Sequence, residues 1–354
     1  MRLAPLGRCW TPCLFLCYQC AMERTSWPVN EIAALSPADA ADLAALREAC
    51  HAVDQPDAPP AHRGDPTAVI RDDAGTIVAE LVLRLAAPGS GSHATMDLAV
   101  HPEHRRRGMG SALMEHALAR ASEGQQTSLM TIVHQQWPGG PARSDAGRAF
   151  VESYGFELAN TEVRSRVGLA DVGRVGLAGV REEGALAAAA EAASADFDTV
   201  WWVDQIPEEL LAGAAALHGT FSTEAPMGQL QVRATTVSVD QLRQEAAAAA
   251  EHGTFRCGVL AVHRPSGAVV GSTFIIAPQG EPADQRLTLV APEFRGHRLS
   301  MRLKIENLRQ LRQQRPDLTE VWTENAESNT PMRRVNEQLG FEPVDYAIRY
   351  HHLW

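Results

Sequence analysis

The sequence predicts an α+β protein made of two similar domains, in each of which helices flank a central sheet. Along both halves, hairpin signals alternate with helical periodicities in the same order. Two short motifs also recur in that order: Val100-x-Pro102-Glu103-x-Arg105 returns as Val290-x-Pro292-Glu293-x-Arg295, and Gly155-Phe156-Glu157 returns as Gly340-Phe341-Glu342. Because both motifs keep their order, we interpret the chain as an internal repeat.

The repeat divides the chain into four segments. Residues 26–170 and 196–354 are the expected domains, and the alanine-rich residues 171–195 are expected to form a connecting helix or linker. Residues 1–25 hold four of the six cysteines, at a spacing that matches no common zinc site, and their apolar run is too short to span a bilayer. We expect this extension to be disordered, or to precede a true start at Met22.

The first half opens with an expected strand at 27–35 and a helix that runs from the Ser36 cap and Pro37 to about Val53. The turn signal Asp72-Asp73-Ala74-Gly75 joins strands at 67–71 and 76–85. The further expected elements are strand 94–100, a helix after Gly110, strand 127–133, helix 145–154, and a strand pair from Gly155 to about Leu169.

The second half repeats this order from strand 200–203 onward. A hairpin crosses Pro265-Ser266-Gly267 between strands 255–262 and 268–276. The other expected elements are helices 207–217, 239–251, 299–314 and 330–339, strands 286–290 and 320–323, and terminal strands.

The charge balance limits the classes of partner. A net charge of −11, from 32 basic and 43 acidic residues, argues against a general nucleic-acid or membrane-surface binder. We expect a cytoplasmic protein without nucleic-acid or membrane partners. The local clustering of arginines favours a small anionic ligand instead.

The strongest functional signal is the junction from Met96 to Leu113, where a strand, a basic turn with glycines and a helix start follow one another. The first turn of a helix has unpaired N–H groups and the positive end of the helix dipole. A glycine entry lets phosphate approach these donors, and Arg105, Arg106 and Arg107 add positive charge. The turn is not a Walker loop, and it lacks the Gly-x-Gly-x-x-Gly spacing of dinucleotide-binding sites. A basic turn that only contacts solvent is therefore the competing interpretation.

On these motifs, each half resembles an N-acetyltransferase domain of the GNAT superfamily, and residues 26–354 together resemble a tandem GNAT protein of the bacterial kind. The family pattern Arg/Gln-x-x-Gly-x-Gly/Ala, which wraps the acetyl-CoA pyrophosphate, is matched in full by Arg105-x-x-Gly108-x-Gly110. The resemblance implies a mixed, mostly antiparallel sheet in each domain, and acetyl-CoA as cosubstrate without a metal. The first-half residues that it assigns to the cofactor are Leu98, Ala99, Val100, Arg105, Arg106, Arg107, Gly108, Met109, Gly110 and Ser111.

The second half departs from the family pattern at the same turn. Arg298 stands where Gly108 stands, and its side chain obstructs close approach of a phosphate unless its guanidinium pairs with that phosphate. The half retains Glu324-Asn325-Ala326 and Asn329-x-x-Met332, which resemble the family's region beside the acetyl-CoA arm. We expect weak cofactor binding there, or none, with these candidate contacts: Val290, Arg295, Asn325 and Asn329.

Acetyl transfer to an amine needs a base for the ammonium proton and donors for the oxyanion. Asp97 is the first candidate base, because it lies on the strand that leads to the cofactor turn, where family members often carry an acidic residue. A strand-edge or capping carboxylate is the competing interpretation. The equivalent second-half residue, Leu287, cannot titrate, while His134 and Glu324 are the other catalytic candidates.

The predicted activity is acetyl-CoA-dependent N-acetyl transfer to a primary amine of a small molecule, by direct attack on the thioester. Neither half supplies the tyrosine that many family members use as general acid, since its position falls on Val151 and on Asn336. The open alternatives are an inactive acyl-CoA-binding, scaffold or regulatory protein, and catalysis in the second half with a regulatory first half. A monomer is one expectation, because the two domains pair within one chain.

Overall fold

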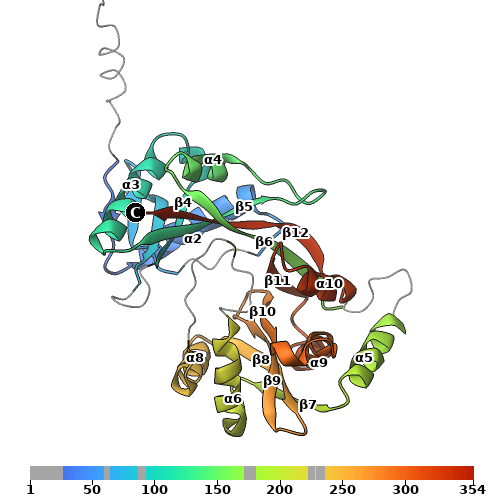
Figure 1. The fold of residues 1–354 in the computed structure, drawn as a ribbon. Helices are drawn as coiled ribbons and strands as arrows, with labels where there is room; N and C mark the ends of the chain where they lie inside the picture. The colour runs from blue at the N-terminus through green and yellow to red at the C-terminus, as the bar shows by residue number, and fades with distance from the viewer. Residues whose placement is uncertain (1–26, 60–63, 87–92, 171–180, 222–227, 229–235) are drawn as a thin grey trace, which may run out of the picture. The chain divides into compact units, whose positions relative to one another are not determined.

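The structure is a computed structural model that describes residues 27–59, 64–86, 93–170, 181–221, 228 and 236–354 (Figure 1). The predictions for residues 1–25 lie outside these ranges. The chain forms two compact units: Met1–Val53, His62–Arg84 and Met96–Gly124 in one, and Asp54–Ala61, Leu85–Thr95 and Gln125–Trp354 in the other. Because the second unit includes the end of the first half, this division does not follow the repeat, and the predicted domain boundaries stay a prediction.

The first unit holds the opening hairpin and two helices. Its strands are β1 (Asn30–Glu31), β2 (Ala68–Arg71), β3 (Ile77–Arg84) and the end of β4 (His93–Val100), in that order. Helices α2 (Pro37–Asp54) and α3 (Met109–Glu123) accompany them. Strand 27–35 was predicted too long, because Pro28 has no N–H for a ladder and only Asn30 and Glu31 pair with β2.

Local chemistry explains why these elements begin and end where they do. The N–H of Asp39 donates to Ser36 Oγ over 3.2 Å, and the N–H of Ser36 donates to Asp39 Oδ2 over 3.0 Å, which starts α2 with a reciprocal cap. In the hairpin, Asp72 Oδ1 accepts the N–H groups of Ala74 and Thr76. Helix α2 then buries its apolar face against the strands, in a cluster of Leu43, Leu46, Cys50, Val69, Ile77 and Ala99.

The second unit contains most of the sheet. Its strands are β5 (Ser128–Gln136), β6 (Glu157–Gly168), β7 (Phe197–Val203), β8 (Phe255–His263), β9 (Ala268–Ala277), β10 (Ala283–Val290), β11 (Glu320–Ala326) and β12 (Glu342–Leu353). Its helices are α4 (Ala146–Glu152), α5 (Arg181–Ala193), α6 (Glu208–Gly219), α8 (Val239–Glu251), α9 (Leu299–Gln314) and α10 (Thr330–Gln338). Helix α5 lies within residues 171–195, of which 171–180 are outside the described ranges, so the predicted connection stays a prediction.

The two halves of the repeat exchange their last strands. The hydrogen-bonded order in the second unit is β5-β12-β6-β11-β10-β9-β8-β7, so β12 of the second half lies between β5 and β6 of the first. Strand β6 in turn pairs with β11. The predicted strand pair from Gly155 to Leu169 and the predicted terminal strands were therefore wrong, because each is a single strand whose neighbours come from the other half.

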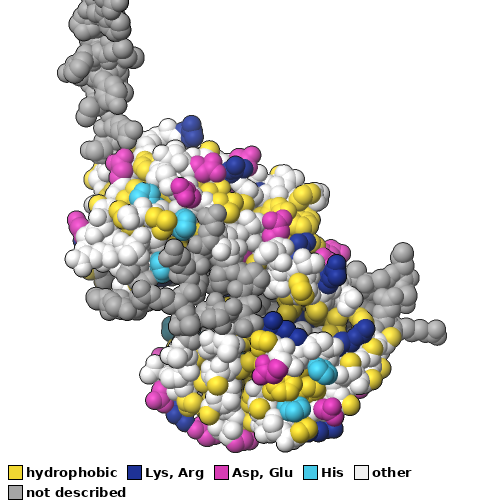
Figure 2. Space-filling model, viewed as in Figure 1, with side chains coloured by type: hydrophobic (Ala, Val, Ile, Leu, Met, Phe, Trp, Pro, Cys, Tyr) yellow, Lys and Arg dark blue, Asp and Glu magenta, His cyan; other side chains and the backbone are white. Residues whose placement is uncertain are grey.

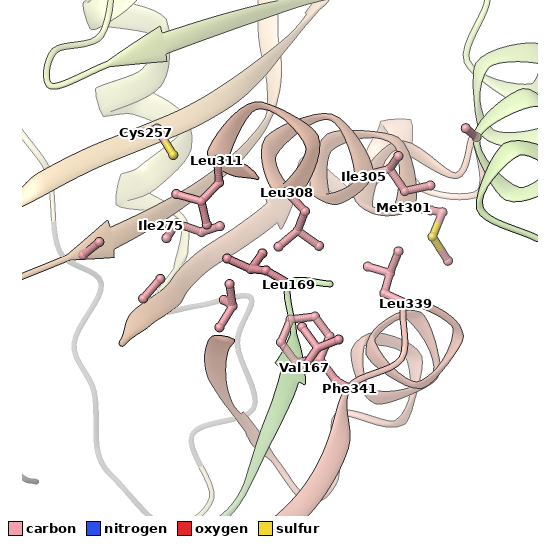
Figure 3. Close-up of a cluster of buried hydrophobic side chains, with 14 of the residues drawn as sticks. Val167, Leu169, Cys257, Ile275, Met301, Ile305, Leu308, Leu311, Leu339 and Phe341 are labelled. Atoms are coloured by element: carbon pink, nitrogen blue, oxygen red, sulfur yellow. The ribbon is translucent and has the colours of Figure 1, made fainter. Parts of the chain in front are cut away.

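The sheet is mixed and mostly antiparallel, as the resemblance implies. The pairing of β10 with β11 is parallel, as is that of residues His93–Thr95 of β4 with β5. Helix α6 packs on β9 and helix α8 on β8, whereas α9 packs on both strands and also contacts α5 (Figure 1). A buried cluster that includes Val167, Leu308 and Phe341 fills the space around α9, and it joins first-half β6 to second-half elements (Figure 3).

Candidate functional site

The predicted phosphate turn lies in the first unit, between β4 and α3. A short 3-10 helix (Pro102–His104) follows β4, and Gly108 precedes the first residue of α3 with φ +89°. This left-handed backbone favours glycine. Among the described residues, no side chain caps α3, whereas Ser238 caps α8 by accepting the N–H of Gln241. The first N–H groups of α3 are therefore suited to an anion.

The arginines of this turn also hold its shape. Arg105 Nε donates to the carbonyl of Val100 over 3.0 Å, and Arg107 Nη2 donates to the carbonyl of Glu103 over 2.9 Å. Trp27 Nε1 donates to the carbonyl of Arg107 over 2.6 Å. Its ring lies 3.8 Å from where a Cβ of Gly108 would be. The Trp27 contact could not be predicted from the sequence, because it joins residues that are 80 positions apart.

The remaining first-half candidates flank the turn. Ala99 is buried in the cluster under α2, and Met109 is buried at the start of α3. Leu98, Val100, Gly110 and Ser111 are half-buried, and Arg106 is exposed with φ +63°. The structure brings these residues together around one strand end and one helix start, as the motif predicts. Their contact with a cofactor stays a prediction.

Asp97 forms an ion pair with the neighbouring strand. Its Oδ2 lies 3.0 Å from Arg84 Nη1, and the two side chains are 39% and 49% exposed. Asp97 thus lies on the predicted strand, but as a partly exposed ion pair.

The second copy of the turn, in the second unit, keeps the backbone shape of the first. Arg295 Nε donates to the carbonyl of Val290 over 3.3 Å, which matches the bond from Arg105 to Val100. Gly296 has φ +90°, and Arg298, which precedes α9, has φ +53°. The turn therefore keeps its shape although Arg298 and Ser300 stand where the first turn has Gly108 and Gly110, but it carries the Arg298 side chain at the helix start.

The strands beside this second turn separate. Residues Ala283–Gln285 of β10 pair with Val321–Thr323 of β11, and the ladder ends there among the described residues. Beyond that point Glu324 and Asn325 pair only with β6, on the other edge of β11. The β11 edge that faces β10 thus has backbone groups outside the ladder, which can bond an extended ligand.

The two asparagines predicted for this region have structural partners. Asn325 Oδ1 accepts from Asn336 Nδ2 over 2.5 Å, and Asn336 is buried. Asn329 Oδ1 caps α10 by accepting the N–H of Met332 over 3.4 Å. Asn325 therefore links β11 to α10, and Asn329 stabilises the start of α10, whatever further contact they make.

Glu324 has a raised pKa, as does the half-buried Asp284 on β10. Surrounding protein raises the pKa of Glu324 by desolvation, the negative charge of Glu162 raises it further, and the arginines Arg164 and Arg349 act in the opposite direction. Its side chain is still 40% exposed, and its Oε2 lies 3.7 Å from Arg349 Nη2. A carboxylate with a raised pKa that remains open to solvent is a candidate for proton transfer.

His134 lies on β5 beside a buried ion cluster. Its Nδ1 is 3.9 Å from Oδ1 of Asp345, which is fully buried. Asp345 accepts from Arg164 Nε over 2.6 Å and from Arg143 Nε over 2.8 Å, and Arg143 also donates twice to Asp57. Sequence reasoning missed this cluster, because its members come from distant segments that only the strand exchange brings together.

Other reactive groups have no evident role in catalysis. Burial raises the pKa of the Cys257 thiol to about 12, so this cysteine is protonated and a poor nucleophile at neutral pH.

In the described ranges, no group of histidines, cysteines and carboxylates has the arrangement of a metal site. None of the described helices combines the length and apolarity that a membrane span requires. Acidic and basic side chains are interspersed on the face that Figure 2 shows.

Comparisons with known proteins agree with this geometry. Residues 64–158 match the family model described as an acetyltransferase (GNAT) domain, while a search of curated proteins found no match. The chain is similar to the solved structure of a tandem GNAT protein from the clavulanic acid biosynthesis pathway, with 28% identity, a TM-score of 0.73, and coverage of 92% of this chain and 98% of that one.

A second solved structure shares the fold alone. It is a GCN5-related N-acetyltransferase from Sphaerobacter thermophilus, with 14% identity, a TM-score of 0.64, and coverage of 93% of this chain and 96% of that one. The family model over residues 64–158 and the neighbour with 28% identity support the tandem GNAT architecture that the motifs predict.

Proposed function

We propose that the protein is an acetyl-CoA-dependent N-acetyltransferase that binds acetyl-CoA at the first-half turn and acetylates a primary amine of a small molecule. The observation that supports this most is Gly108, which holds φ +89° before the 15-residue helix α3. Without a Cβ, it leaves the first N–H groups of α3 open to a pyrophosphate. Arg106 and Arg107 add positive charge on the exposed side of the turn.

The transfer also requires that a residue of the chain accept the ammonium proton of the amine. Acetyl-CoA supplies the activated thioester, and the amine attacks it once its ammonium has lost a proton. The amide C–N bond forms as the thioester C–S bond breaks, and coenzyme A leaves as a thiolate that takes a proton from solvent. Asp97 is the proposed acceptor of the ammonium proton in the first half. The arrangement favours direct attack over a covalent intermediate, because the buried Cys257 thiol stays protonated.

We infer the class of acceptor from the similarity to a solved structure. The tandem GNAT protein with 28% identity is described as part of a biosynthetic pathway that leads to clavulanic acid, which is a small molecule. A primary amine of that size class is therefore our proposed acceptor, rather than a protein side chain.

Catalysis in the second half is the second candidate. Glu324 favours it, because the pKa of this carboxyl is raised by burial and by Glu162, whereas Asp97 is paired with Arg84. The end of the β10–β11 ladder directly before Glu324 supports the same alternative. In that case the first half would bind acetyl-CoA in a regulatory role.

The test is release of free thiol from acetyl-CoA across a panel of primary amines, with the product identified by mass. The proposal predicts turnover with at least one small amine and a product heavier by one acetyl group. Thiol release without any acetylated amine, or no release with any amine although acetyl-CoA binds, would contradict transferase activity and support a binding or scaffold role.

A further inference from the structure

The second unit contains a cavity of about 220 Å³ that the proposed acetyl transfer does not use. It lies among strands β7, β8 and β9 and helices α6 and α8, and its described lining takes no residue from β10, β11 or α9. The lining residues are Trp202, Asp204, Gln205, Ile206, Leu211, His218, Leu242, Arg243, Glu245, Ala246, Arg256 and Phe274.

Arg256 forms the charged floor of this cavity. It is only 9% exposed, and its guanidinium carbon lies 6.0 Å from the Trp202 ring centroid and 5.9 Å from that of Phe274. Among the described residues, its side chain has no hydrogen-bond or ion-pair partner. A buried guanidinium has five N–H donors and is costly to leave without acceptors. Such a side chain in a cavity wall points to an anionic group of a ligand.

The rings around Arg256 are held in place by their own contacts. Trp202 pairs with Gly258 across β7 and β8, where a Cβ would lie only 2.5 Å from Trp202 Cζ2, so the glycine makes room for the ring. Phe274 stacks on His218, whose Nε2 lies 2.9 Å from Ser272 Oγ. Burial lowers the pKa of His218 to about 4, so this side chain is neutral at pH 7.

The mouth of the cavity has the opposite charge. Asp204 and Glu245 are exposed there, and both raise the pKa of Arg256 by their negative charge, against the larger lowering by burial. Arg243, the other cation of the lining, is already bonded to Glu208 and to Asp240. Glu245 Oε1 accepts from Gln241 Nε2 over 3.2 Å, but an amide donor leaves the negative charge of this carboxylate unpaired. One cation at the floor and two carboxylate charges at the mouth therefore remain for a ligand.

This charge pattern selects among ligand classes. Two carboxylates at the mouth repel a simple anion, and Arg256 repels a simple cation. A ligand that carries both charges satisfies both ends. Ile206, Leu211 and Leu242 add apolar walls, which suit an apolar body between or beside those charges.

We propose that this cavity binds a small zwitterion with an apolar body, the chemistry of an apolar α-amino acid. Its carboxylate bonds Arg256 between the two rings. Its ammonium faces Asp204 and Glu245, and its side chain contacts the leucines. This site is independent of the proposed acetyl-transfer function.

The test is calorimetric titration of the whole protein with L-leucine and with L-phenylalanine, in the absence of acetyl-CoA. We expect at least one of them to bind, and its amide or its N-acetyl derivative, which each lack one charge, to bind at least about tenfold more weakly. Arg256→Met should cause a similar loss. It should stay folded, because methionine suits an apolar floor.

Arg264→Met is the matched control, since Arg264 lies just after the same strand, β8, but is exposed and paired with Asp198. The control should bind like wild type, and thermal melting should show all three proteins folded. Absence of binding by both amino acids, or equal binding by folded Arg256→Met, would overturn the proposal.

Discussion

Gly108 and Arg298 occupy equivalent places before helices α3 and α9, and both hold a left-handed backbone, with φ +89° and +53°. Two residues earlier, Arg106 and Gly296 are left-handed as well. Each turn thus has one glycine at its two left-handed positions, but not at the same one. The backbone shape is kept in both halves, and only the first half leaves the helix start free of a side chain.

The base can be assigned by paired substitutions. If Asp97 takes the ammonium proton, Asp97→Asn should lower kcat/KM for the amine by about 10²- to 10⁴-fold. Glu324→Gln should then leave kcat/KM within about threefold, as expected of a surface change away from the reacting atoms. Steady-state rates of thiol release with both variants provide the measurement.

The pH profile separates the two candidates further. A general base must be deprotonated, so the rate falls as pH drops through its pKa. If Glu324→Gln abolishes activity instead, catalysis belongs to the second half. The acidic limb of the wild-type profile should then lie above the ordinary glutamate range, because burial and Glu162 raise the pKa of Glu324.

The buried cluster around Asp345 should matter for stability. Asp345→Asn leaves Arg164 and Arg143 without their shared buried carboxylate, which should lower the free energy of unfolding by about 3–5 kcal/mol. Asp57→Asn is the matched control, because Asp57 is 25% exposed and Arg143 keeps Asp345. Urea unfolding of both variants checks this, and equal effects would contradict the central role of Asp345.

Lys304 should destabilise the protein at neutral pH. It is 1% exposed on α9, its Nζ lies 5.3 Å from the Phe341 ring centroid, and burial lowers its pKa to about 7. The unfolded chain keeps its lysine protonated up to about pH 10.4. Between these values the unfolded state binds more protons, so the free energy of unfolding should rise with pH.

Lys304→Met removes this penalty. We expect it to raise the free energy of unfolding at pH 7 by about 1–4 kcal/mol and to flatten the rise toward alkaline pH. Gln313→Met, at an exposed position of the same helix, should change it by less than about 0.5 kcal/mol. Urea unfolding at several pH values measures both effects. A lower free energy of unfolding for Lys304→Met than for wild type at pH 7 would contradict the prediction that the buried Lys304 charge destabilises the protein.

Local sequence signals predicted most helices and strands. They did not predict which strands pair with each other over long sequence distances. Helices 239–251 and 299–314 agree with α8 and α9 at both ends, because a serine cap starts the first and clear periodicity marks the second. Strand β6 carried no local sign that its neighbours would be β11 and β12. The residue pattern of a segment predicts whether it forms a helix or a strand. It does not indicate that the neighbouring strands come from the other half of the chain.

The candidate site divides in the same way. The phosphate turn was predictable, since its glycines and arginines lie within a few consecutive residues. The Asp97–Arg84 pair, the Asp345 cluster and the partners of Asn325 were not, because each depends on side chains from separate strands or helices. The left-handed backbone of Arg298 also departs from what its side chain favours, and the surrounding turn imposes it.

The central claim is that acetyl-CoA binds at the first-half turn, and Gly108→Arg tests it most directly. The chain itself shows that arginine can hold this position in a folded turn, at Arg298. Calorimetric titration should show acetyl-CoA binding to wild type, and binding at least about tenfold weaker to Gly108→Arg. The reciprocal Arg298→Gly should keep the wild-type affinity or gain a second site. Equal affinity of wild type and folded Gly108→Arg for acetyl-CoA would contradict the account.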